Sequence, residues 1–194
     1  YFMMGLPTET TEDLDGIADL AKKVVDAYFA VPRGERAKGL RVVCSASVFV
    51  PKPFTPFQWE PQDTQEMVRD KQSHLREKLR IKGVTFNYHE SDLSYLEACF
   101  ARGDRRMGQV LLRAYQKGCM LDGWTELFKY DMWREAFAEL GIDPAFYAYR
   151  RREKDEIMPW DVIDCGVTKE FLWREKEKAE KAQTTKDCRK GCNG

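Results

Sequence analysis

The chain has 194 residues, enough for one domain with a good hydrophobic core or for parts of two domains. Its 32 lysine and arginine residues balance 32 aspartate and glutamate residues, which disfavours a protein that binds nucleic acid over its whole surface. No stretch approaches the roughly 18 apolar residues of a transmembrane helix, so the sequence predicts no association with a membrane. Six scattered cysteines in a chain of this size favour reduced thiols and a cytoplasmic location over a disulfide framework.

The first ten residues have the pattern of a buried strand that leads into a helix. Residues 1–4 are apolar without alternation, and Gly5, Pro7 and Thr10 then precede an acidic helix start. Such a run predicts a parallel strand buried on both faces. Because α/β proteins bind ligands at the carboxyl ends of their strands, residues 5–10 are the first candidate site. With no initiator methionine or basic leader, we expect a carboxyl-terminal piece of a longer protein.

The next two segments predict a helix and a second strand. Residues 11–30 carry apolar side chains at helical spacing, which are Leu14, Ile17, Ala21, Val24 and Tyr28. Residues 40–50 are rich in valine and small side chains, as in a second buried parallel strand. A right-handed strand-helix-strand crossover is the natural connection. Two strands cannot close a barrel, so this sheet needs further strands from elsewhere.

Residues 51–61 contain four prolines interleaved with Phe54, Phe57 and Trp59, which predicts an extended aromatic loop. The loop either only packs or also lines a pocket. A helix follows over residues 65–80, capped by Asp63 or Thr64. Residues 84–88 alternate like a short strand that either joins the edge of the sheet or starts a small accessory sheet.

From residue 91 the pattern is helical. Glycines follow three helical segments, and residues 124–149 concentrate aromatic side chains, which predicts a helical domain with its own aromatic core. Thr168 caps a last helix over residues 169–182. The expected organisation is therefore a strand-helix-strand part with its loop, a flanking helix and strand, a helical accessory domain and a cysteine-containing tail, with the boundaries 1–61, 62–90, 91–183 and 184–194.

Several of these segments resemble a known superfamily. Residues 2–10, Phe-Met-Met-Gly-Leu-Pro-Thr-Glu-Thr, look like the G-x-P-x-E-T turn after the fifth strand of the radical S-adenosylmethionine (SAM) barrel. Residues 47–59 resemble the segment after its sixth strand. Residues 93–98, 102–106 and 159–167 are similar to an uncharacterised bacterial branch that joins a cobalamin-binding-type domain to a radical SAM core. The cluster-binding C-x3-C-x2-C motif of that core is absent from residues 1–61.

The resemblance implies an α/β fold with the last two strand-helix units of a partial TIM-type barrel, followed by a mainly α-helical C-terminal extension. It implies an enzyme in which a [4Fe-4S] cluster and SAM start radical chemistry on an unidentified substrate, either a small molecule or RNA or protein. Cobalamin is a further candidate cofactor. Because the main cluster motif is missing, we expect this piece to be inactive alone and to work with the missing N-terminal part of the same protein.

The resemblance also implies where SAM binds. It places the adenosine against the turn after the first strand and the top of the second strand, at Met3, Met4, Gly5, Pro7, Glu9, Thr10, Val50 and Pro51. In this interpretation Gly5 allows close backbone approach and Glu9 or Thr10 hydrogen-bonds polar edges of the cofactor. The alternative is that residues 7–10 form only a helix entry, capped by Thr10 or Thr11.

Cys188 and Cys192 are the candidate metal ligands. Thiolates at this spacing can hold irons of an auxiliary cluster, although a third cysteine is needed to complete the C-x3-C-x2-C pattern. Two cysteines alone do not make a closed site, and the alternative is a disordered tail with two spare thiols.

Four residues are candidates for substrate binding, namely His89, Arg102, Arg105 and Arg106. The arginines suit an anionic group, which they can grip with forked hydrogen bonds. An arginine pairing with Asp104 between helices is an equally good interpretation. A rival function also uses this region, as a module without catalytic activity that recognises RNA or a protein partner through its arginines and aromatic residues; the zero net charge weakens the RNA form of it.

Overall fold

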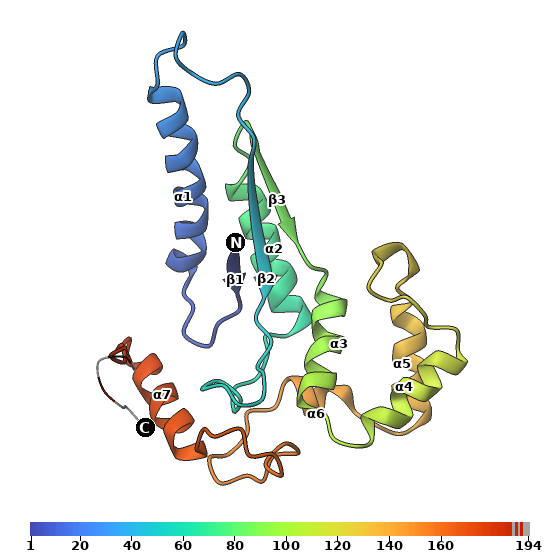
Figure 1. Cartoon of the computed structure of the whole chain (residues 1–194). Coiled ribbons are helices and arrows are strands. Elements are labelled where there is room, and N and C mark those ends of the chain that lie inside the picture. The colour runs from blue at the N-terminus through green and yellow to red at the C-terminus, as the bar shows by residue number, and fades with distance from the viewer. Residues whose placement is uncertain (188, 190, 192–194) are drawn as a thin grey trace. The chain divides into compact units, whose positions relative to one another are not determined.

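The computed structural model describes residues 1–187, 189 and 191. They form two compact units: unit 1 comprises residues 1–49 and 63–94, and unit 2 comprises residues 50–62 and the chain from Tyr95 onward. The strands and helices of unit 1 are β1 (Phe2–Met4), α1 (Thr11–Ala30), β2 (Val42–Val48), α2 (Gln65–Lys78) and β3 (Val84–Tyr88) (Figure 1). Helix α3 (Ser91–Arg102) runs from unit 1 into unit 2. Unit 2 continues with α4 (Met107–Gln116), the short 3-10 helix η1 (Thr125–Leu127), α5 (Tyr130–Glu139), α6 (Pro144–Ala148) and α7 (Lys169–Glu180).

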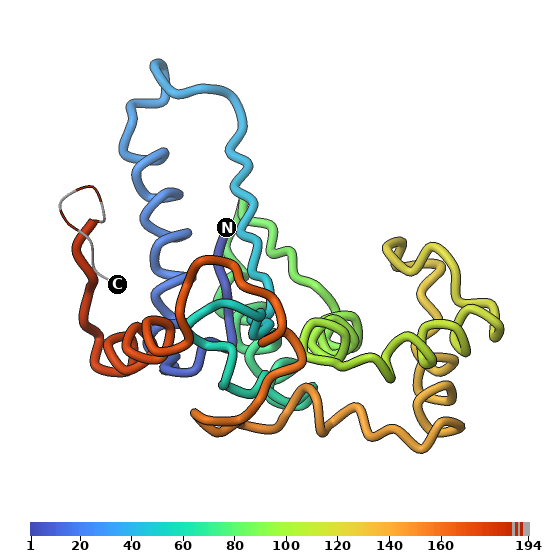
Figure 2. The backbone as a smooth tube through the Cα atoms, turned by 60° about the horizontal axis from the view of Figure 1, so that its bottom comes forward, coloured from blue at the N-terminus to red at the C-terminus, as the bar shows by residue number. Residues whose placement is uncertain are grey.

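The three strands form one parallel sheet in the order β1-β2-β3. Phe2 lies opposite Ala46, and Val42 lies opposite Val84. The expected parallel pairing of the first two strands is confirmed, and the third strand extends this sheet. Figure 2 shows the long connection that leaves α1 before the chain returns as β2. The fold is of the α/β class, as the sequence predicts, and the described residues supply three strands, whereas a closed TIM-type barrel has eight.

Both helices of unit 1 pack on one face of this sheet. Met4, Cys44, Ala46 and Val48 lie in one buried cluster with apolar residues of α1 and α2, which are Leu14, Ile17, Ala18, Ala21, Val68 and Leu75. Side chains of a strand alternate between its faces, so the neighbouring residues project to the other side. There Met3 and Val43 are each 47% exposed. The prediction that these strands are buried on both faces is therefore wrong for this chain, because no helix of unit 1 covers the second face.

The start of α1 follows the predicted capping pattern. Asp13 donates its backbone N–H to the Thr10 hydroxyl at 3.3 Å, and its carboxylate accepts from the Thr10 backbone N–H at 2.8 Å. This capping box satisfies two N–H groups that the helix itself cannot pair. Further along, Val25 is buried and Val24 is 47% exposed, so the predicted helical stripe is corrected by one residue. Helical geometry places Val25, four residues after Ala21, on the covered face.

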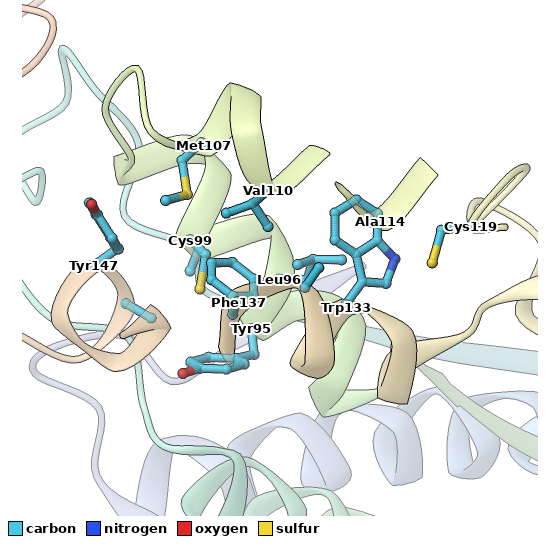
Figure 3. Close-up of a cluster of buried hydrophobic side chains, with 13 residues drawn as sticks. Tyr95, Leu96, Cys99, Met107, Val110, Ala114, Cys119, Trp133, Phe137 and Tyr147 are labelled. Atoms are coloured by element: carbon cyan, nitrogen blue, oxygen red, sulfur yellow. The ribbon is translucent and has the colours of Figure 1, made fainter. Parts of the chain in front are cut away.

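Unit 2 has two hydrophobic clusters. The larger one joins α3, α4, α5 and α6 and includes Leu96, Cys99, Val110, Trp133 and Phe137 (Figure 3). The smaller one contains Trp59 with Met158, Trp160 and Leu172. Trp59 is fully buried, and its ring meets that of Trp173 edge to face at 5.0 Å. The aromatic loop therefore packs with the helical part of the chain, which moves the expected boundary at residue 61.

No helix in the described part of the chain is both long and apolar enough to cross a bilayer.

Candidate cofactor-binding site

The turn after β1 depends on glycine at position 5. Gly5 is buried and has φ +85°, in the left-handed region that side chains disfavour. A Cβ atom there would lie 2.9 Å from Oδ2 of Asp63. The close approach that Gly5 permits is thus to Asp63, which precedes α2, so in this chain the residue serves the packing of the turn.

Glu9 holds the turn in place. One carboxylate oxygen accepts the Gly5 backbone N–H at 2.9 Å, and the other lies 2.7 Å from the Lys71 ammonium. Lys71 lies equally close, 2.7 Å, to Asp63. The side chains of Glu9, Asp63 and Lys71 are only 5%, 16% and 21% exposed, so this ion triad is shielded from water. It connects the loop after β1 to helix α2.

The triad raises the pKa of its lysine. Burial lowers the pKa of Lys71, but the hydrogen bonds with Asp63 and Glu9 more than offset burial and leave the pKa above its ordinary value. Both oxygens of Glu9 are engaged within the chain, and the Thr10 hydroxyl caps α1. The polar atoms of Glu9 and Thr10 hold the turn and the helix start, in agreement with the alternative interpretation of residues 7–10 as a helix entry.

The other predicted residues of the first strand and turn differ in exposure. Met4 has no exposed surface and lies in the core beneath α1 and α2, so it is not open to a cofactor. Met3 lies on the bare face of the sheet and is 47% exposed. Leu6, Pro7 and Thr8 are exposed at the carboxyl end of β1. The open surface of this region is therefore Met3 with residues 6–8.

Val50 and Pro51 belong to unit 2. Pro51 is fully buried, and Val50 is partly buried against the cluster that includes Tyr95 and Val110. A neighbouring residue, Lys52, pairs with Glu97 of α3. The contacts of Val50 and Pro51 are therefore packing contacts within unit 2.

His89, Arg105 and Arg106 are the exposed members of the predicted substrate set. His89 follows β3, and its backbone carbonyl accepts a hydrogen bond from the Gln72 side chain at 2.8 Å. The Arg105 side chain is exposed and makes no ion pair within the described residues. Arg105 is thus the exposed arginine of the set whose guanidinium is not already paired among the described residues, whereas that of Arg106 contacts Asp104.

Arg102 is buried, contrary to its predicted contact with a substrate. It has no exposed surface and donates to two backbone carbonyls, that of Glu60 and that of Arg150, the latter at 2.8 Å. Burial and the neighbouring charges of Arg152 and Arg150 lower the pKa of Arg102 to about 10. Because its two terminal nitrogens donate to the main chain, Arg102 ties three segments of unit 2 together.

Arg106 forms the arginine-aspartate pairing that the sequence left as an alternative. Its guanidinium makes a forked contact with Asp104, with hydrogen bonds of 2.7–3.2 Å. These bonds lower the pKa of Asp104 to about 2, and Tyr147 donates a further hydrogen bond to the same carboxylate at 3.3 Å. The pairing is local, between residues two apart, and does not join two helices.

The metal-binding prediction for Cys188 and Cys192 lies outside the described residues. Of the described cysteines, Cys44, Cys99 and Cys119 are buried and Cys165 is exposed. Burial raises the pKa of the Cys99 thiol to about 12, which makes it unreactive. Within the described part of the chain, no three cysteine, histidine or carboxylate side chains come together as a metal-binding group.

Comparison with known proteins finds one longer relative. The "Uncharacterized protein MJ0966" of Methanocaldococcus jannaschii is 29% identical to this chain over 138 residues. The match covers 66% of this chain and 28% of that protein, so the chain spans little more than a quarter of the relative's length. No protein-family model matches the chain, and no solved structure matches it significantly.

Sequence reasoning missed one buried charge network, which is centred on Glu60 in unit 2. Glu60 is 1% exposed and pairs with Arg151 at 2.6 Å and with Lys176 of α7 at 3.1 Å. Arg152, also buried, donates to the Arg102 carbonyl at 2.6 Å. The only signal in the sequence is a carboxylate directly after Trp59 in an aromatic loop. Its partners are far away along the chain, where they look like surface charges.

Proposed function

We propose that this chain is the C-terminal part of a radical SAM enzyme and supplies the last strands of its barrel. The observation that supports this most is the one-sided sheet. In doubly wound α/β sheets helices cover both faces, whereas in a TIM-type barrel all helices lie outside and the other face of each strand points inward. Three parallel strands in chain order, with α1 and α2 on the same face, match the barrel arrangement.

In this proposal the bare face of the sheet lines the barrel interior. Met3 and Ser47 pair across β1 and β2 near the carboxyl ends of these strands, and Asn87 is exposed on β3. Carboxyl ends are where α/β barrels bind their ligands. We assign SAM to this end, against Met3 and the exposed turn residues Leu6, Pro7 and Thr8. Glu9, Lys71 and Asp63 do not contact SAM in this proposal, but they hold the turn against α2.

The iron-sulfur cluster belongs, in the same proposal, to the part of the longer protein that precedes this chain. The described residues do not fit a cluster, because they gather no three suitable ligands in one place. When bound, such a cluster supplies the electron for cleaving SAM. The residues of this chain would position the nucleoside and exclude water. The substrate class, whether small molecule, RNA or protein, and a role for cobalamin would be set by the longer protein.

Formation of 5'-deoxyadenosine tests the proposal. The longer protein that carries this chain would be reconstituted anaerobically with iron and sulfide, reduced with dithionite, supplied with SAM and analysed by liquid chromatography and mass spectrometry. We expect 5'-deoxyadenosine from the longer protein and none from the 194 residues alone. Cleavage of SAM by the isolated chain, or none by a longer protein that holds its cluster, would overturn the proposal.

One feature of unit 2 favours the rival function, a module that recognises a partner. Helix α4 and the loop after it expose a group of large apolar side chains, including Leu112 and Tyr115. Such a surface suits contact with protein and not with the phosphates of RNA. The arginine form of the rival loses support, because Arg102 is buried and Arg106 is paired with Asp104.

A further inference from the structure

Unit 2 exposes an apolar patch on α4 and the loop that follows it. The patch consists of six large side chains that are each more than half exposed: Leu111 54%, Leu112 58%, Tyr115 61%, Met120 58%, Leu121 68% and Trp124 63%. Figure 3 shows the opposite side of α4, where Met107, Val110 and Ala114 pack into the buried cluster. Helix α4 is therefore apolar on both sides, and its own unit covers only one of them.

A groove runs along the patch. It has a volume of about 860 Å³ and is lined by all the patch residues except Trp124, together with Gly108, Cys119, Asp122 and Trp133. Two of its lining residues have buried polar atoms without a hydrogen-bond partner among the described residues, namely Oδ1 of Asp122 and Nε1 of Trp133.

The size of the patch suits a protein interface. With side chains of roughly 150–200 Å² each, these exposed fractions amount to about 600 Å² of apolar surface. A typical monomer has a largest patch of about 300–600 Å², and a standard dimer buries about 800 Å² on each partner. The patch and a narrow polar rim would together supply that area.

The charges beside the patch favour a second copy of the chain as the partner. On the flank of α4, Arg113 pairs with Glu139, and Lys117 lies 2.7 Å from both Glu135 and Glu139. These pairs leave the flank without a dominant sign of charge. The whole chain has a formal net charge of zero, so two copies approach each other without net repulsion.

We propose that this chain forms a symmetric dimer through the patch, with α4 of one copy against α4 of the other. An interface of this kind uses the same residues on both sides and closes after two copies. Tyr115 and Trp124 are the expected anchors, since aromatic side chains dominate the energetics of most interfaces. The proposal is independent of the function proposed for the sheet, because it uses only residues of unit 2.

Sedimentation equilibrium on the 194-residue chain tests the dimer. We expect the wild-type chain to approach twice the monomer mass as its concentration rises through the micromolar range. Leu112→Glu places a charge in the centre of the patch and should weaken dimerisation by at least about 100-fold. Leu20→Glu is the matched control, because Leu20 is 49% exposed on α1 in unit 1 and should leave dimerisation unchanged.

Circular dichroism should show both variants folded, since both positions are exposed, and Met120→Glu replaces Leu112→Glu if that variant fails to fold. A wild-type chain that stays monomeric at about 100 μM would overturn the proposal. Equal dimerisation of the wild-type chain and Leu112→Glu would do the same. A longer protein that is monomeric, with this patch protected from hydrogen exchange, would assign the patch to another part of that protein and also overturn it.

Discussion

The ammonium of Lys71 lies 2.7 Å from the carboxylate of Glu9, so helix α2 reaches back to the turn that follows β1. The other oxygen of Glu9 accepts the Gly5 backbone N–H at 2.9 Å. A single carboxylate thus connects the end of a strand, the entry to α1 and a residue of α2. This connection sets the shape of the turn. In our proposal it also fixes the position of the exposed residues 6–8, against which SAM binds.

Replacing Lys71 should therefore destabilise unit 1. Lys71→Met leaves Glu9 and Asp63 facing each other without a cation in a shielded site, which should cost about 2 kcal/mol of unfolding free energy. Lys22→Met is the control, because Lys22 and Asp26 form a surface pair with side chains 61% and 59% exposed. That variant should change stability by less than about 0.5 kcal/mol. Urea unfolding measures both, and equal effects would contradict the role of the triad.

The same site predicts a dependence on alkaline pH. The raised pKa of Lys71 means that the folded state holds this proton more strongly than the unfolded state. The stabilisation is therefore complete below the ordinary pKa of lysine, about 10.4, and is lost as the pH rises through the higher value of the folded state. The stability difference between the wild-type chain and Lys71→Met should shrink in that range. A difference that stays constant from pH 8 upward, measured by urea unfolding, would exclude this linkage.

Two glycine substitutions should have opposite effects. Gly5→Ala forces a side chain into left-handed backbone and against Asp63 Oδ2, at a cost of about 2 kcal/mol or more. Gly16 lies within α1, where an added Cβ meets nothing within 4 Å. Gly16→Ala should therefore raise stability by roughly 0.5–1 kcal/mol, because alanine favours helix. Thermal unfolding followed by circular dichroism decides between these signs, and a neutral Gly5→Ala would show that the turn tolerates a side chain.

Among the arginines of residues 102–106, Arg102 should contribute to the stability of the fold and Arg105 should not. Arg102→Met removes the donors to the carbonyls of Glu60 and Arg150 and should cost roughly 2–5 kcal/mol, since buried carbonyls lose their partners. Arg105→Met alters an exposed side chain and should stay within about 0.5 kcal/mol. Chemical denaturation compares the two variants. Similar losses of unfolding free energy in both variants would mean that the burial of Arg102 does not determine its contribution to stability.

Local sequence signals predicted much of the fold. Thr168 caps the last helix as expected, and Thr10 and Thr64, each one of two candidates, cap α1 and α2. These predictions depend on a few neighbouring residues and on hydrogen bonds that any helix start requires. The parallel pairing of β1 and β2 followed from two apolar runs separated by one helix. The side of the sheet that stays bare could not be predicted, because an apolar run does not reveal which face finds a covering element.

The turn after β1 was predictable from the sequence, but the contacts of its residues were not. The sequence located the turn after β1, yet it did not reveal that Lys71 would occupy the carboxylate of Glu9. The partner lies on α2, which is distant from Glu9 along the chain. The same limit hid the burial of Arg102, since its contacts are to backbone carbonyls of residues distant in sequence. Contacts between distant segments decide such roles, and a local pattern does not contain them.

The central claim is that the bare face of the β1-β2-β3 sheet lines a SAM-binding barrel. The most direct measurement is the rate of 5'-deoxyadenosine formation by the reconstituted longer protein carrying Ser47→Arg or Ser73→Arg. Both serines are exposed in this chain, Ser47 on the bare face and Ser73 on α2. We predict a loss of about 100-fold or more for Ser47→Arg, because the new side chain enters the cofactor space, and little change for Ser73→Arg. Equal rates in the two variants, or no 5'-deoxyadenosine from the wild-type protein, would contradict the account.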